Sequence, residues 1–164
     1  MKLIIATPSP FARKVRVILR EKAIHCEEII DVPWNKDTIT KGLNPLGKIP
    51  ILIKDGIEPI FDSKNIIKYL EQINPEPSFY PESMSKKLKA SLLETAADGI
   101  CDAVVLIFLE KSRSQNLRSK AWIDRQKEKI HTGTQYLSDN LLTKKYFVDD
   151  HFTIADVAAF CCLE

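Results

Sequence analysis

The first 74 residues alternate short apolar runs with segments in which apolar residues recur at helical spacing. The apolar runs predict strands at residues 3–6, 26–32, 49–53 and 57–61. The helical spacing predicts helices over residues 11–22, 36–43 and 63–73. Lys54, Asp55 and Gly56 separate the last two runs and are typical of a hairpin turn. The predicted order is therefore strand, helix, strand, helix, strand, strand, helix.

The rest of the chain has a different pattern, without strand signals. Three prolines lie between Pro75 and Pro81 and predict a linker. Apolar residues then recur at helical spacing over 84–112 and 121–142, which predicts two long helices that pack as an antiparallel pair. Thr153 and Asp156 have the spacing of a capping box and predict the start of a third helix.

This pattern predicts two domains. We expect an α+β domain over residues 1–74, a linker over 75–85 and an all-α domain over 86–164. The last predicted helix reaches the final residue without a stop signal. We therefore expect the helical domain to be incomplete at its C-terminal end.

Composition and charge exclude several functional classes. The 164 residues include 24 basic and 22 acidic ones, so a net charge of +2 gives no reason to expect a nucleic-acid or membrane-surface partner. No apolar run approaches the length of a membrane span. The four cysteines (Cys26, Cys101, Cys161 and Cys162) have neither Cys-x-x-Cys spacing nor a histidine at metal-site distance. We interpret them as buried thiols of a cytoplasmic protein and expect no metal site.

The junction between the first strand and the first helix is the clearest candidate for chemistry. Ser9 is a typical N-cap residue, and Pro10 suits the first helical position. A strand that leads directly into a helix presents unpaired backbone N–H groups and the positive end of the helix dipole. The sequence therefore predicts an anion site in front of Ser9, and a thiolate is an anion.

Four blocks of this sequence resemble the glutathione S-transferase family, in particular bacterial members related to the theta, beta and zeta classes. The blocks are SPFARKV from Ser9, NPLGKIPIL from Asn44, Asp62-Ser63 followed by IIKYL from Ile66, and FTIAD from Phe152. The resemblance implies a thioredoxin-like N-terminal domain of order βαβαββα, an all-α C-terminal domain and a homodimer. Thioredoxin-like redox proteins open their first helix with Cys-x-x-Cys. Ser9 and Ala12 occupy those places here, which excludes dithiol–disulfide exchange.

The resemblance assigns the anion site to the thiol of glutathione. We hypothesise that the Ser9 hydroxyl donates a hydrogen bond to the thiolate, helped by backbone N–H groups around Phe11 and Ala12. The alternative role for Ser9 is that of a purely structural N-cap. Thr7, on the strand side of the junction, is a competing hydroxyl.

The resemblance also implies contacts for the cysteinyl and γ-glutamyl parts of the tripeptide. Ile49 and Pro50 resemble the family's cis-proline segment, in which the backbone of Ile49 pairs with the cysteinyl part; the alternative is a trans proline that opens a strand. Ser63 would bind the α-carboxylate at a helix N-terminus, and Asp62 would face the ammonium group. An aspartate N-cap also needs no ligand, and the two roles can coexist.

The glycyl carboxylate needs a cation. Lys48 is the first candidate and Lys36 the second; the alternative for each is an ordinary surface lysine.

Asp98 and Asp102 lie one turn apart on an otherwise apolar predicted helix. A buried carboxylate must be paired or functional. We leave both residues out of the catalytic set. Trp34 and Trp122 are interpreted as packing residues.

The resemblance implies a cytoplasmic glutathione transferase acting in detoxification. Glutathione is the expected co-substrate, without a further cofactor, and the acceptor is expected to be a small hydrophobic electrophile in a pocket formed partly by Val104, Val105 and Phe108. The alternative is a non-catalytic protein of the same fold, similar to the stringent-starvation proteins that bind RNA polymerase. The presence of Ser9 together with Asp62 and Ser63 favours the enzyme.

Overall fold

The computed structural model describes residues 1–163. Its strands are β1 (Lys2–Ile5), β2 (Glu27–Ile30), β3 (Ile51–Ile53) and β4 (Ile60–Phe61). Its α-helices are α1 (Pro10–Glu21), α2 (Thr40–Leu43), α3 (Ser63–Ile73), α4 (Met84–Lys111), α5 (Lys120–Leu141) and α6 (Ile154–Leu163), with a short 3-10 helix at Gln115–Leu117. The chain divides into two compact units, Met1–Ser78 and the part from Phe79 onward, and the boundary falls within the predicted linker.

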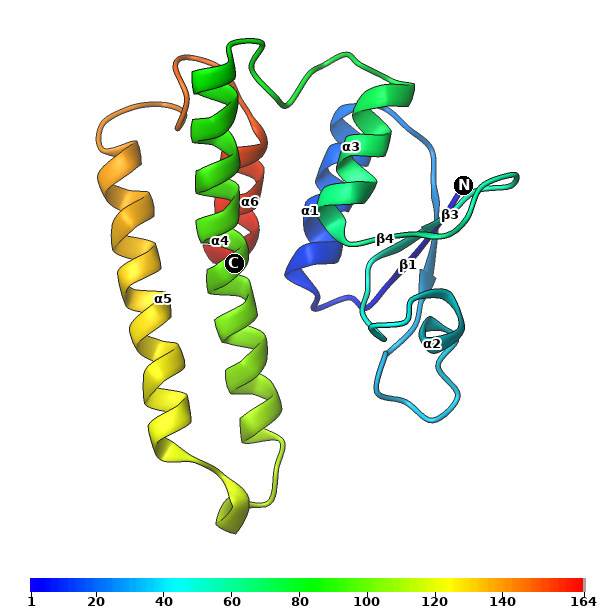
Figure 1. Cartoon of the computed structure of the whole chain (residues 1–164), viewed down its shortest axis with the longest axis vertical. Coiled ribbons are helices and arrows are strands. Elements are labelled where there is room, and N and C mark those ends of the chain that lie inside the picture. The colour runs from blue at the N-terminus through cyan, green and yellow to red at the C-terminus, as the bar shows by residue number, and fades with distance from the viewer. Residues whose placement is uncertain (164) are drawn as a thin grey trace. The chain divides into compact units, whose positions relative to one another are not determined.

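The first unit contains one mixed sheet with the strand order β2-β1-β3-β4. β1 is parallel to β2 and antiparallel to β3, and β4 is antiparallel to β3. Helices α1 and α3 pack against each other on one face of the sheet (Figure 1). The fully buried side chains come from these strands and helices and include Leu3, Ile4, Val15, Ile18, Ile51, Leu52, Ile66, Ile67 and Leu70. This is the predicted thioredoxin-like arrangement, and the expected fold class is confirmed.

A buried ion pair joins the C-terminal ends of α1 and α3. The Lys22 ammonium lies 2.8 Å from Glu71 Oε1 and donates hydrogen bonds of 2.8 Å to the carbonyl oxygens of Asn74 and Pro77. The Asn74 side chain in turn donates to the carbonyl oxygen of Lys22 at 3.0 Å. A buried ammonium with these partners is fully compensated, and removing one partner would leave an unpaired charge.

Four elements are shorter than the sequence pattern predicts. The strands expected over residues 26–32 and 49–53 are limited to Glu27–Ile30 and Ile51–Ile53. The helix expected over residues 36–43 begins only at Thr40, and the strand expected over 57–61 is limited to Ile60–Phe61. Helix α2 starts late because Thr38 and Thr40 donate hydrogen bonds to the Asp31 side chain. These bonds hold the chain before Thr40 in a non-helical conformation. All four elements nevertheless occur in the predicted order.

The cysteines and tryptophans differ in part from expectation. None of the four cysteines forms a disulfide within residues 1–163; Cys101 and Cys161 are buried as predicted, but Cys26 and Cys162 are only partly buried. Burial nonetheless raises the pKa of the Cys162 thiol to about 11, so this thiol is protonated at neutral pH. Trp34 and Trp122, interpreted as packing residues, are 59% and 40% exposed.

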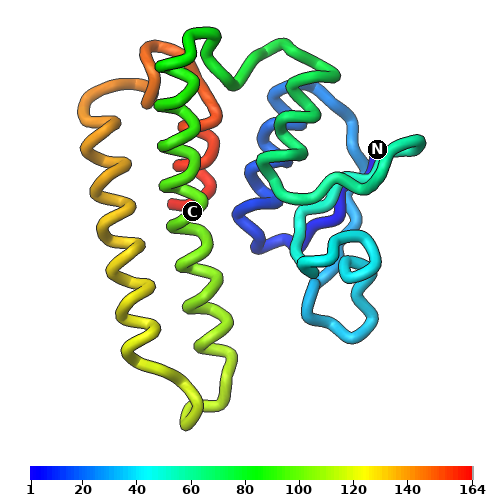
Figure 2. Tube along the Cα trace, in the orientation of Figure 1, coloured from blue at the N-terminus to red at the C-terminus, as the bar shows by residue number. Residues whose placement is uncertain are grey.

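The second unit is helical, with α5 and α6 packed against α4 (Figure 2). Gly133 on α5 allows the close approach to α4, since a Cβ atom at this position would lie 2.8 Å from Ile100 Cγ1. One half of the predicted capping box is present at the start of α6, where Asp156 Oδ2 accepts from the Thr153 N–H at 2.8 Å and from its hydroxyl at 3.0 Å. The Asp156 N–H donates to the Thr153 carbonyl oxygen at 3.1 Å, not to its hydroxyl.

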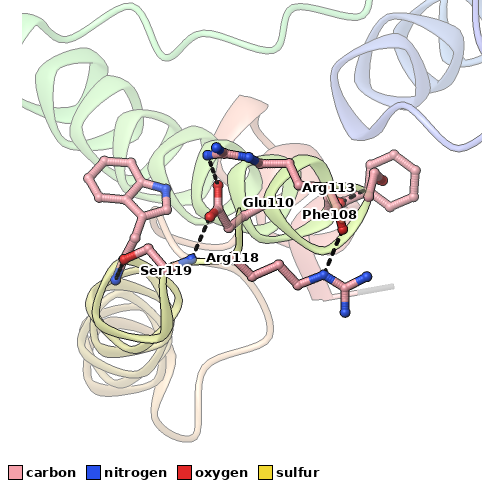
Figure 3. Close-up of polar contacts among 7 residues, drawn as sticks. Phe108, Glu110, Arg113, Arg118 and Ser119 are labelled. Carbon is pink, nitrogen blue, oxygen red and sulfur yellow. Dashed lines mark hydrogen bonds and ion pairs between the residues drawn. The ribbon is translucent and has the colours of Figure 1, made fainter. Parts of the chain in front are cut away.

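Glu110 organises the turn between α4 and α5 (Figure 3). Its carboxylate accepts a hydrogen bond of 2.7 Å from the Ser119 N–H and pairs with the Arg113 guanidinium at 3.2 Å. The Arg118 side chain donates to the Arg113 carbonyl oxygen at 2.8 Å. The Ser119 N–H is the main reason that the pKa of Glu110 lies below its ordinary value, with the charge of Arg113 contributing.

Among residues 1–163, every helix is too short or too polar to cross a bilayer.

Candidate functional site

The register of the sheet brings the predicted site segments to one edge. β1 leads into Ser9, and Ile51 at the start of the antiparallel β3 lies opposite Ile4. Pro50 directly precedes Ile51 and therefore lies at the same edge as the end of β1. Phe61, the last residue of β4, also lies opposite Ile51 and leads into α3. The start of α1, the start of β3 and the start of α3 consequently share one edge, although they are far apart in sequence.

Ser9 is the N-cap of α1, as predicted. Its backbone is extended, with φ −74° and ψ 117°, and its Oγ accepts a hydrogen bond of 3.2 Å from the Ala12 N–H. Its carbonyl oxygen accepts the first intrahelical bond from the Arg13 N–H at 3.0 Å. Accepting from Ala12 uses a lone pair of Oγ and leaves the hydroxyl hydrogen for an external acceptor. The structural and the catalytic role of Ser9 are therefore compatible.

The cap changes which backbone groups remain for an anion. Ala12 was expected to help bind it, but its N–H already donates to Ser9, and Pro10 has no N–H. The Phe11 N–H is thus the first-turn donor that remains, and the first turn of α1 carries no acidic residue. Thr7, the competing hydroxyl, is exposed in the turn before Ser9.

Asp62 and Ser63 form the start of α3. Asp62 is the N-cap, and its carboxylate accepts a hydrogen bond of 2.9 Å from the Lys64 N–H. Its backbone has φ 70° and ψ 128°, a region that a non-glycine residue rarely occupies. Such strain costs of order 1–3 kcal/mol and tends to occur at ligand sites. Ser63 is the first helical residue, so its N–H is one of those without a partner inside the helix. The residue is 4% exposed.

The segment before β3 carries three further predicted site residues. The Ile49–Pro50 peptide bond is cis, which is the isomer that the family resemblance implies. Pro50 is buried and Ile49 partly buried, whereas the Lys48 side chain is exposed at the same sheet edge. Lys36, the second lysine candidate, is also exposed and lies in the segment between β2 and α2.

Sequence reasoning missed a group of polar residues at this edge. Asp31 follows β2, and its N–H donates to the Ile5 carbonyl oxygen at 2.7 Å, at the end of β1. Its Oδ2 accepts from the hydroxyls of Thr38 at 2.6 Å and Thr40 at 2.5 Å, and from the Thr40 N–H at 3.0 Å. The signal was an aspartate followed within ten residues by two threonines, in a stretch without helical periodicity.

The hydrogen bonds to Asp31 determine its protonation. Burial raises the pKa of this carboxyl group, but the donors from Thr38 and Thr40 outweigh burial, and the pKa lies below its ordinary value. Asp31 is therefore ionised at neutral pH, and its three hydrogen bonds are charge-assisted.

The predicted residues of the second unit lie on α4. Val104 and Phe108 are 45% and 56% exposed, and Val105 is partly exposed. Asp98 is partly buried, whereas Asp102 is exposed, so the argument from a buried carboxylate does not apply to Asp102. Within the described residues, no group of three or more histidine, cysteine, aspartate or glutamate side chains could hold a metal ion.

Comparisons with known proteins agree with the resemblance. The family model of the glutathione S-transferase N-terminal domain matches residues 8–73, and that of the glutathione S-transferase C-terminal domain matches residues 96–164. The uncharacterized GST-like protein YibF of Escherichia coli K12 is 34% identical over 163 residues. The alignment covers 99% of this chain and 80% of YibF.

Two solved structures are similar over nearly the whole chain. A glutathione S-transferase of Methylobacterium radiotolerans, in complex with glutathione sulfonate, is 40% identical with a TM-score of 0.95. A glutathione S-transferase of Methylobacillus flagellatus, with glutathione bound, is 34% identical with a TM-score of 0.94. Each match covers 99% of this chain, and they cover 76% and 80% of the respective solved chains.

Proposed function

Since the chain belongs to the glutathione S-transferase family, we propose that it binds and ionises glutathione and transfers the glutathionyl group to a small hydrophobic electrophile. The observation that carries the proposal is the shared sheet edge, where the N-terminus of α1, the Ile49–Pro50 segment and the N-terminus of α3 meet. Two helix N-termini at one edge suit a ligand with two separated anionic groups. Ionised glutathione is such a ligand.

The thiolate belongs, in this proposal, at the start of α1. Lowering the pKa of a thiol from about 8.5 by about two units requires roughly 2.7 kcal/mol of preferential stabilisation of the anion. A hydroxyl hydrogen bond to a charged acceptor contributes about 1.5–3 kcal/mol, and a helix N-terminus about 0.3–2 kcal/mol. The Ser9 hydroxyl and the Phe11 N–H can together supply this amount, while the Ala12 N–H keeps Ser9 in place.

The γ-glutamyl end belongs at the start of α3. The N–H and hydroxyl of Ser63 bind the α-carboxylate, and Asp62 faces the α-ammonium group. The Asp62 carboxylate keeps its hydrogen bond from the Lys64 N–H through Oδ1, which leaves Oδ2 for the ligand. The backbone of Asp62 supports this assignment. An ordinary N-cap does not need a positive φ, and strained residues of this kind tend to occur where a ligand binds.

The middle and the glycyl end of glutathione complete the site. The backbone N–H and C=O of Ile49 pair with the cysteinyl part in the manner of an added strand. The glycyl carboxylate is bound by Lys48, with Lys36 as the second cation. Both lysines are exposed, so each can reach a ligand at the edge of the sheet.

The reaction needs no covalent intermediate on the protein. The thiol proton leaves to solvent, and the thiolate sulfur donates an electron pair to the electrophilic carbon. A carbon–sulfur bond forms while the leaving group departs with the electron pair of its broken bond.

The proposal includes a homodimer in the cytoplasm. Large apolar side chains on α4 that are half exposed, Leu88 at 58% and Leu92 at 52%, support a covering partner. Four cysteines that form no disulfide within the described residues support a reducing compartment. Light scattering that gives the mass of two chains would agree with the dimer, and a single-chain mass at micromolar concentration would contradict it.

The test combines glutathione binding by calorimetry with turnover of a chlorodinitrobenzene-type electrophile. We expect both, and we expect Ser63→Ala to weaken binding about tenfold, the equivalent of one charge-assisted hydrogen bond. Ser78→Ala is a matched control, because Ser78 bonds to Glu71 near the end of α3, not at its start. Binding without turnover would instead support the non-catalytic interaction protein, and absence of binding would contradict the proposal.

A further inference from the structure

The segment between β2 and β3 is anchored by buried polar side chains. Thr40 is fully buried and Asn44 is 2% exposed, although both are polar. Thr40 donates to Asp31 Oδ2 through its hydroxyl at 2.5 Å and through its N–H at 3.0 Å. A buried hydroxyl or amide without a partner is costly, so these bonds fix where the segment can lie.

Asn44 continues the same chain of hydrogen bonds toward β3. Its N–H donates to the Thr40 carbonyl oxygen at 2.9 Å. Its side-chain amide donates to the Lys48 carbonyl oxygen at 2.7 Å and accepts from the Leu46 N–H at 2.9 Å. The backbone of Lys48 is therefore held through Asn44 and Thr40 to Asp31.

The other end of this chain of bonds is the strand that leads into Ser9. The Asp31 N–H donates to the carbonyl oxygen of Ile5, the last residue of β1, at 2.7 Å. β3 returns to the same strand, because Ile51 lies opposite Ile4. In Figure 1 the segment is the cyan loop with α2, below the strands of the first unit. Hydrogen bonds thus connect β1 through Asp31, Thr40 and Asn44 to Lys48. The chain continues from Lys48 into β3, which pairs with β1.

We infer that Asp31 is a positioning residue for the glycyl end of glutathione, because its carboxylate fixes the segment that carries Lys36 and Lys48. The inference rests on the proposed function. A lysine side chain is long and flexible, so its ammonium group is held near a ligand only if its backbone is fixed. Without Asp31, the segment from residue 32 to 48 loses the acceptor that three donors share.

A truncated ligand separates this role from a merely structural one. γ-Glutamylcysteine has the thiol and the γ-glutamyl group of glutathione but lacks the glycyl residue. If Asp31 positions the glycyl contacts, Asp31→Ala weakens binding of glutathione and leaves binding of γ-glutamylcysteine unchanged. A general loss of structure would weaken both ligands, since both need Ser9 and Ser63.

Calorimetry of each ligand with the full chain measures this difference. We expect Asp31→Ala to lower the affinity for glutathione about tenfold and that for γ-glutamylcysteine less than about twofold. Thr40→Val, which removes one donor at constant volume, is expected to fall between wild type and Asp31→Ala. Asp31→Asn is expected to retain most of the affinity, because its amide oxygen can accept from the same donors.

Asp55→Ala is the matched control. Asp55 is an exposed aspartate in the hairpin turn after β3, at the opposite edge of the sheet, and we expect no change with either ligand. Equal affinity of Asp31→Ala and wild type for glutathione would overturn the inference, as would an equal loss for both ligands. Failure of wild type to bind either ligand would instead contradict the proposed function.

Discussion

Two helices of this protein begin with the same cap in different surroundings. Ser9 at the start of α1 accepts from the Ala12 N–H at 3.2 Å, and Ser119 at the start of α5 accepts from the Trp122 N–H at 3.2 Å. Both serines thus satisfy one of the unpaired N–H groups of their helix. The caps alone do not distinguish a functional serine from a structural one.

The difference lies in what else faces each helix start. At α5, the carboxylate of Glu110 accepts the Ser119 N–H at 2.7 Å, so the protein supplies its own anion (Figure 3). At α1, the Ser9 N–H donates to the neutral carbonyl oxygen of Ala6, and the first turn has no acidic residue. The comparison shows that Glu110 already supplies an anion at the start of α5, and it supports the proposal that the positive end of α1 binds an anion from outside the chain.

The largest expected effect comes from giving α1 a carboxylate of its own. Ser9→Asp keeps an N-cap oxygen but places a negative charge where the thiolate would lie. We expect the pKa of bound glutathione to rise above that of the free thiol. Turnover at pH 7 would then fall about a hundredfold, because the thiolate fraction falls tenfold for each unit of pKa.

Ser9→Thr is the companion variant, since it retains both the cap and the hydroxyl donor. We expect its turnover to remain within about fivefold of wild type, with steady-state kinetics as the measurement. Equal turnover of Ser9→Asp and wild type would show that no anion binds at this helix.

A second prediction removes the internal anion of α5. The pKa of Glu110 is held below its ordinary value of 4.5, mainly by the Ser119 N–H. Its charge therefore stabilises the fold fully above that value, and the contribution is lost as the pH falls through the lowered pKa. We expect Glu110→Gln to melt at a lower temperature than wild type from pH 6 to 8, and the difference to shrink below about pH 4.

Thermal unfolding followed by circular dichroism over this pH range measures the effect. Glu128→Gln, an exposed glutamate on α5, is the control and should leave the melting temperature unchanged. A difference between Glu110→Gln and wild type that grows toward low pH would contradict the assigned role.

The smallest expected effect concerns the caps themselves. Ser9→Ala and Ser119→Ala each remove one N-cap bond of the same length, and each is expected to lower the free energy of unfolding by about 1 kcal/mol. For a chain of this size, that corresponds to a loss of roughly 2–4 °C in melting temperature. Urea unfolding of both variants tests the equality, and a loss confined to Ser9→Ala would show that the caps are not equivalent.

Local sequence signals predicted most of the fold. The periodicity of Val15, Ile18 and Leu19 predicted α1, and the capping residues Asp62 and Thr153 predicted the starts of α3 and α6. These features depend on neighbours within one or two turns. The resemblance then implied the architecture that the two family models and the solved structures support.

Long-range features could not be read in the same way. The register that places Ile4 opposite Ile51 is set by the packed sheet. The roles of Thr38 and Thr40 depend on the Asp31 carboxylate, which lies 7 and 9 residues earlier in a stretch without helical or strand periodicity to place it. The exposure of a single side chain such as Trp34, at 59%, also depends on the packed fold and not on residue type alone. The assignments of the individual glutathione contacts remain predictions.

The most direct test is the pKa of the bound thiol, measured by ultraviolet titration of the thiolate with wild type, Ser9→Ala and Ser119→Ala. We predict that wild type and Ser119→Ala lower the pKa of glutathione by about two units from about 8.5, and that Ser9→Ala returns it most of the way. An unchanged pKa in Ser9→Ala, or a bound thiol of ordinary pKa in wild type, would contradict the claim that α1 holds the thiolate.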